Sequence, residues 1–236
     1  MTITAIAFIV AVLAGVASAH DAVLTWTLPR LVGLVTKTDV SIGAVRVTGS
    51  TVVLRDVHVR KGGNPLLDAS SVRIAYSPRD LLPGSRHRYG LRRVDVDGAT
   101  FTLVRLADGA YNIPLHGASG PPPAPSPHWF NPVPLALRVH VVDGAIALRS
   151  PYAIDPESRI VDVKGVTLDA SVDSLARTHY TLRGAFVQPQ REPVDAVGTI
   201  DEERGFAMHH VTAAHVPLRQ LADFFINSKA LQIDTG

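Results

Sequence analysis

Apolar and polar residues alternate with a period of two through several long stretches of this chain. In the segment 135–141 every second residue is leucine or valine, and 166–172 repeats the pattern with valine, leucine and alanine. The shorter segment 72–76 shows it again. Successive side chains of a β-strand point to opposite faces, so this period places one face of each strand against apolar material. We therefore predict an all-β protein.

Short turn-forming sequences separate many of the alternating stretches. Asp-Gly, Gly-Ser and Gly-Gly-Asn occur between them, and these residues tolerate the positive φ that tight turns require. Strands at this spacing, with few helical stretches, predict an antiparallel meander. The further predicted strands are 40–47, 51–60, 91–97, 99–106, 144–149, 179–187, 194–201 and 206–213.

Two segments depart from the β pattern. The proline-rich run 120–127 cannot join a hydrogen-bonded ladder and is predicted to be a stiff extended linker. A short amphipathic helix is predicted after Pro217, with Leu218, Leu221, Ala222 and Phe225 on its apolar side. We divide the chain into a signal anchor with its membrane-proximal segment (1–35), a first β unit (38–119), the linker (120–134) and a second, incomplete β unit (135–236).

A short internal echo spans this linker. Val96-Asp97-Gly98-Ala99 lies before it, and Val142-Asp143-Gly144-Ala145 lies after it. Shared hairpin-turn chemistry and true repetition of a structural unit both explain the echo.

The N-terminus indicates export. Residues 3–19 contain nothing more polar than threonine and serine, which is close to the length that spans a bilayer. Ala17-Ser18-Ala19 fits a signal-peptidase site, but no basic residue precedes the run. Apolar character resumes directly afterwards, and Trp26 with Arg30 suits a membrane interface. We therefore favour a retained anchor over a cleaved signal.

Catalytic and metal-binding patterns are absent from the sequence. The chain has no cysteine, no G-x-S-x-G, no P-loop, no G-x-G-x-x-G and no H-E-x-x-H. His209 and His210 are adjacent on a predicted strand and so point to opposite faces. The carboxylates of 201–203 lie in a predicted hairpin turn. We predict no enzyme activity, no cofactor and no tightly bound metal.

One basic cluster occurs, over residues 86–93. An aromatic residue inside it raises nucleic-acid binding as one interpretation, but export argues against that partner. Attraction to anionic lipid headgroups and a plain solvated loop are the other two interpretations. The candidate membrane-surface residues are Arg86, Arg88, Arg92 and Arg93.

Several short motifs follow one another in a defined order along the chain. The motifs lie at 40–43, 52–59, 65–69, 72–77, 80–84, 94–98, 101–105 and 108–113, with a further pair at 216–221 and 231–236. This order resembles the start of AsmA-like and TamB-like envelope proteins, in which a "d-G-x-w/y-N-l" stretch closes the first unit. Asp108-Gly109-Ala110-Tyr111-Asn112-Ile113 is similar to that stretch. Members of this group are usually longer, so the chain is expected to be a fragment or a truncated member.

The resemblance implies an elongated, strongly curved antiparallel β-sheet that forms a groove with an apolar concave face. It also implies a role in carrying lipid between membranes or in outer-membrane assembly. The expected partners are phospholipid or another acyl-chain lipid, the inner membrane and other envelope proteins. The expected location is the inner membrane, with the β part in the periplasm. A structural or adhesion-type secreted β-sandwich, with two sheets closed on each other, is the alternative. The candidate lipid-groove residues are Leu135, Leu137, Val139, Val141, Val166, Leu168 and Val172.

Overall fold

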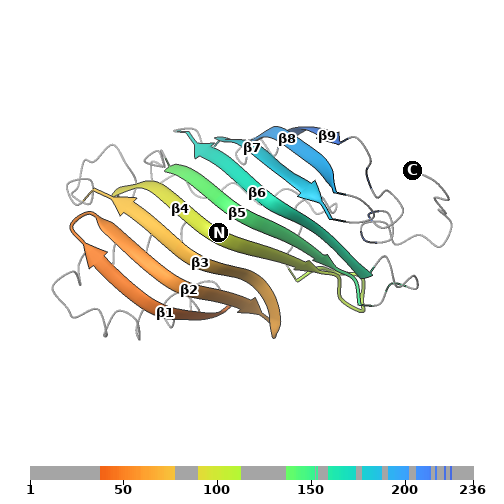
Figure 1. Cartoon of the computed structure of the whole chain (residues 1–236), viewed down its shortest axis with the longest axis horizontal. Coiled ribbons are helices and arrows are strands. Elements are labelled where there is room, and N and C mark those ends of the chain that lie inside the picture. Colours follow the sequence, from red (N-terminus) through yellow and green to blue (C-terminus); the bar gives the residue numbers. More distant parts are fainter. Residues whose placement is uncertain are drawn as a thin grey trace, which may run out of the picture.

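Nine strands in a single sheet account for most of the residues that the computed structural model describes. Those residues are 38–77, 90–112, 137–151, 153, 159–173, 177–187, 191–201, 206–213, 216, 221 and 224. The strands lie side by side in chain order, from β1 at the lower left of Figure 1 to β9 at the upper right. They are β1 (Asp39–Thr48), β2 (Thr51–Lys61), β3 (Asn64–Tyr76), β4 (Leu91–Val104), β5 (Leu137–Arg149), β6 (Ile160–Val172), β7 (Arg177–Phe186), β8 (Glu192–Asp201) and β9 (Phe206–Ala213). The all-β prediction is confirmed.

The antiparallel meander is confirmed for every neighbouring pair except one. β4 and β5 are parallel, with Val94 opposite Val139 and Leu103 opposite Leu148. A tight turn cannot join parallel strands, because the chain must return to the end from which the first strand started. The connection 105–136, which contains the predicted proline-rich linker, is long enough for that return. The predicted β units on its two sides therefore contribute neighbouring strands to one sheet.

The two Asp-Gly pairs of the internal echo lie inside strands and not in hairpin turns. The segments predicted as 91–97 and 99–106 form most of the single strand β4, and those predicted as 135–141 and 144–149 form most of β5. Gly98 has a φ of 61° and Asp143 a φ of 51°. The positive φ that permits a turn also permits a β-bulge, which inserts a residue without ending the strand. The prediction of turns at these two points was therefore wrong.

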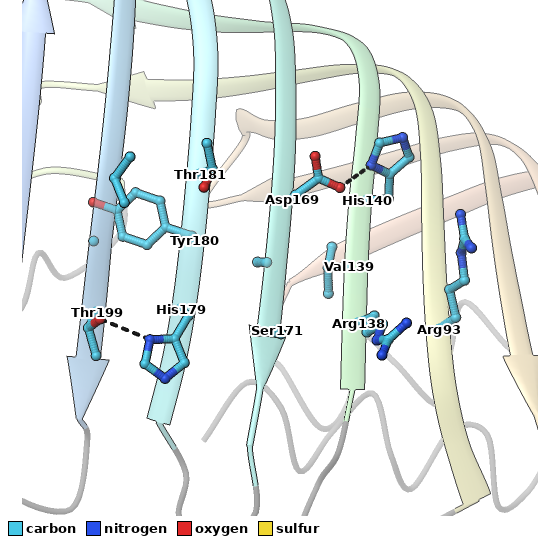
Figure 2. A pocket seen from close by; sticks show the side chains of 13 residues that line it. Arg93, Arg138, Val139, His140, Asp169, Ser171, His179, Tyr180, Thr181 and Thr199 are labelled. Carbon is cyan, nitrogen blue, oxygen red and sulfur yellow. Dashed lines mark hydrogen bonds and ion pairs between the residues drawn. The ribbon is translucent and has the colours of Figure 1, made fainter.

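Irregular residues cross six neighbouring strands at one level of the sheet. We call this set the bulge row, and its members are Gly43, Asp56, Ser70, Gly98, Asp143 and Gly165. Each shifts the alternation of its strand by one residue, so that Leu54 and Val57 of β2 both belong to the same buried cluster. Bulges bend strands and increase their twist. In Figure 2 the yellow and green ribbons, β4 and β5, curve away above the labelled side chains.

One face of the sheet, which we call the apolar face, carries two clusters of buried side chains. The first spans β1 to β5 and includes Val52, whose exposed fraction is 1%. The second lies beyond the bulge row and includes Val163, Phe186 and Phe224. Phe224 belongs to helical backbone and is fully buried. The predicted helix therefore contributes Phe224 to the core, whereas Leu218, Ala222 and Phe225 lie outside the described residues.

The segment 108–112 connects the end of β4 to β3 and to the C-terminal helical residues. The buried Asn112 side chain accepts a hydrogen bond from the Val104 N–H and donates to the carbonyls of Pro65 and Thr102. The Tyr111 hydroxyl donates to the Phe224 carbonyl at 2.9 Å, and the two rings pack with centroids 5.4 Å apart. This motif therefore links β3, β4 and the C-terminal helical residues.

Within the described ranges, no helix is long and apolar enough to cross a membrane. The predicted signal anchor, residues 1–35, lies outside those ranges. Its retention in the membrane stays a prediction.

Candidate functional site

A continuous row of apolar side chains crosses the whole sheet on the apolar face. Each residue of this apolar row is the register partner of the next, from β1 to β9. The row is Val45, Leu54, Val72, Val96, Val141, Leu168, Leu182, Ala196 and Val211. Pairing in register holds neighbouring side chains about 4.5–5.5 Å apart at their Cβ atoms. The row is therefore an unbroken apolar strip perpendicular to the strands.

The burial of these side chains falls along the row. Val45 and Leu54, on β1 and β2, are buried. From Val72 on β3 to Ala196 on β8 the row is half-buried. Val211 on β9 is 61% exposed. Much of this apolar strip is therefore accessible to a ligand of matching chemistry.

The predicted groove residues that the structure describes all lie on the apolar face of β5 and β6. Leu137 pairs with Val172 and Val141 pairs with Leu168, while Val139 lies between these two pairs and Val166 lies opposite Gly144. Leu137 and Val166 are buried, and the remaining four are half-buried. Leu135 lies outside the described residues.

Of the nine residues in the apolar row, the predicted groove residues included Val141 and Leu168, and three of the seven that were missed show why. Val96, on β4, lies opposite Val141, and Leu182, on β7, lies opposite Leu168. Val72 continues the strip on β3. All three belong to alternating stretches, so the signal was present. The bulges hid which stretches share a face, because each bulge changes the phase of the alternation.

The opposite face, which we call the polar face, carries paired charges. His58 contacts Asp68 at 2.6 Å between β2 and β3, and His140 contacts Asp169 at 2.5 Å between β5 and β6. Arg93 contacts Asp95 at 2.6 Å within β4. Exposed ion pairs of this kind contribute about 0–1 kcal/mol each to stability. They therefore define the solvated face of the sheet more than they hold it together.

A hollow of about 540 Å³ lies across β4 to β8 on the polar face (Figure 2). Two arginines, three hydroxyl residues and two histidines are among the residues that line it. They are Arg93, Arg138, Ser171, Thr181, Thr199, His140 and His179. Of the predicted membrane-surface residues, Arg93 lies in this hollow, and Arg92 is exposed on β4. Arg86 and Arg88 lie outside the described residues.

The histidines of β9 do not share a site. His209 contacts the Tyr180 hydroxyl at 2.6 Å, whereas His210 contacts Thr212 at 3.3 Å. Partial burial raises the pKa of Tyr180 above its ordinary value. Among the residues that the structure describes, no three His, Asp or Glu side chains gather as a metal site.

No family model matches this chain, and a search of curated proteins gives no match. The resemblance to AsmA-like and TamB-like proteins therefore rests on the order of short motifs alone.

Proposed function

We propose that this chain is a membrane-anchored envelope protein that holds the acyl chains of lipids on the apolar face of its sheet. The apolar row supports this proposal most directly. It supplies one apolar side chain from each of nine strands, and most of the row is half-buried or exposed. A solvated apolar strip of this extent is unfavourable unless a partner covers it.

The dimensions of the strip suit an acyl chain. Neighbouring strands lie about 4.8 Å apart, so eight intervals span roughly 38 Å. The hydrocarbon half of a bilayer, which one extended acyl chain fills, is about 15 Å thick. Each CH₂ group transferred from water to such a strip contributes about 0.8 kcal/mol. A bound lipid is therefore a chemically matched cover for part of the row.

The predicted anchor supports a location beside a membrane. The apolar run 3–19 and the interface residues Trp26 and Arg30 would hold the sheet next to a source of lipid. Transfer of that lipid between membranes, or a contribution to outer-membrane assembly, belongs to the same proposal.

A closed sandwich is the competing architecture, and it predicts a different response to a buried charge. All nine described strands belong to one sheet, so a sandwich requires a facing surface from elsewhere, such as a second copy. In that case an introduced carboxylate on the apolar face would lie in a sealed core.

The test places the same substitution on opposite faces of one strand. Val139→Glu puts a carboxylate on the apolar face of β5, and Val142→Glu is its control, because Val142 is 44% exposed on the polar face. Both variants are expected to fold, and we expect only Val139→Glu to lose phospholipid that co-purifies with the detergent-extracted protein. Native mass spectrometry would quantify that lipid. Undiminished lipid in folded Val139→Glu contradicts the proposal, and loss of the fold supports the sandwich.

A further inference from the structure

Two arginines lie side by side on the polar face, at one end of the hollow. Arg93 of β4 and Arg138 of β5 are register partners on parallel strands, and both line the hollow (Figure 2). Like charges directly opposite each other destabilise a sheet. Arg93 is partly neutralised by Asp95, which it contacts at 2.6 Å. Within the described part of the chain, Arg138 has no acidic partner.

Three side chains that can donate hydrogen bonds follow Arg138 in register across β6, β7 and β8. Ser171 is the register partner of Arg138, His179 is the partner of Ser171, and Thr199 is the partner of His179. The His179 ring contacts the Thr199 hydroxyl at 2.9 Å. Guanidinium groups offer fixed forks of N–H donors, and hydroxyls can donate beside them. An anion with several oxygen atoms matches this set.

The acidic groups near the hollow are already engaged. Asp169 lines it, but its carboxylate contacts His140 at 2.5 Å. Asp95 holds Arg93. Among the lining residues, the two guanidinium groups outnumber the single carboxylate of Asp169, so the lining itself carries one net positive charge from these groups.

We propose that this hollow binds a phosphate group, with Arg138 and Arg93 as the principal ligands and Ser171 beside them. Arginine binds phosphate through two parallel charge-assisted hydrogen bonds, which are about twice as strong as neutral ones. A bound phosphate also relieves the repulsion between the paired arginines. The phosphate belongs either to a lipid headgroup or to a small soluble molecule. The site is separate from the apolar row, so it does not depend on acyl-chain binding.

The test uses the full chain in neutral detergent at constant ionic strength. The probes are inorganic phosphate and water-soluble dihexanoyl phosphatidic acid, with binding followed by calorimetry and ³¹P NMR. Arg138→Gln is expected to weaken phosphate binding about tenfold. Arg183→Gln is the matched control, because Arg183 is a polar-face arginine of β7 outside the hollow. Asp169→Asn removes a negative charge from the lining and is expected to tighten binding a few-fold.

The two phosphate sources give different results in a Val141→Glu background, where a carboxylate interrupts the apolar row at a residue that does not line the hollow. Tighter binding of phosphatidic acid than of inorganic phosphate there indicates a headgroup site, and equal binding indicates a soluble phosphate. No binding of either probe by the wild-type chain overturns the proposal, as does an equal loss in Arg138→Gln and Arg183→Gln. If Arg138→Gln does not fold, phosphate must still raise the melting temperature of the wild-type chain above its value in chloride. Absence of that rise also overturns the proposal.

Discussion

The first two strands and the last five share one apolar row but differ in how deeply its side chains are buried. Val45 and Leu54 of β1 and β2 are buried, whereas Val141 and Leu168 of β5 and β6 are half-buried. At the far edge, Val211 is largely exposed. The sequence pattern is the same in both regions. A period of two therefore determines which face a side chain occupies, while the depth of burial depends on what lies over that face.

A carboxylate placed on the apolar face of β2 or of β5 should give the largest difference in stability between the two regions. Val52 of β2 and Val139 of β5 are connected in register through Ile74 and Val94. Val52→Glu would bury an unpaired carboxylate at a site that is 1% exposed, at a cost of about 4 kcal/mol or more. That is comparable with the whole stability of many domains, about 5–15 kcal/mol. We expect Val52→Glu to unfold and Val139→Glu to keep most of its stability, as measured by circular dichroism and urea denaturation. Equal loss in both variants would remove the distinction between the regions.

Truncation of a side chain should sharpen the same comparison with a smaller effect. Leu54 and Leu168 both belong to the apolar row, and only Leu54 is buried. Leu54→Ala should cost about 2–5 kcal/mol through lost burial and a residual cavity. Leu168→Ala should cost roughly half as much, because part of its surface already contacts water. The free energy of unfolding from urea titration of both variants measures the difference. A larger loss of unfolding free energy in Leu168→Ala than in Leu54→Ala would contradict the conclusion that Leu54 is the more deeply buried of the two.

Tyr111 gives the smallest expected effect, and it depends on pH. Desolvation raises the pKa of Tyr111 above its ordinary value, and Arg105 partly opposes that rise. Above pH 10 the unfolded chain therefore releases this proton before the folded chain does. The stability that Tyr111 contributes is present below pH 10 and is lost as the pH rises through the folded-state pKa.

Tyr111→Phe should remove this alkaline loss and cost about 1 kcal/mol at neutral pH, since the hydrogen bond from the Tyr111 hydroxyl to the Phe224 carbonyl is lost. Tyr180→Phe, whose hydroxyl contacts the exposed His209, is the comparison for the neutral-pH cost. Melting temperatures between pH 7 and pH 11 measure both effects. An unchanged alkaline slope in Tyr111→Phe would show that another group causes it.

The local sequence pattern was sufficient to predict the strands and their apolar faces. It was not sufficient to predict where one strand ends and the next begins. Asp97-Gly98 and Asp143-Gly144 look like turns, because a positive φ serves a turn and a bulge equally well. Only the pairing with neighbouring strands decides between them, and that pairing is not local. The polar-face hollow had no sequence signal for the same reason. Arg93 and Arg138 are far apart in the chain and become neighbours only because β4 and β5 are parallel.

The bulge row has a consequence for how such a gene can change. Deleting the codon for Asp56, Gly98 or Asp143 would restore simple alternation within one strand, and the apolar side chains on both sides of the deletion would stay on one face, as Leu54 and Val57 do in the native strand. Its two neighbours would still carry their own extra residue, so the altered strand could match neither of them. Single-codon insertions and deletions at this level are therefore harmful one at a time. The six positions should be inherited as a set, and point substitutions that preserve the irregular backbone should be the main variation found among them.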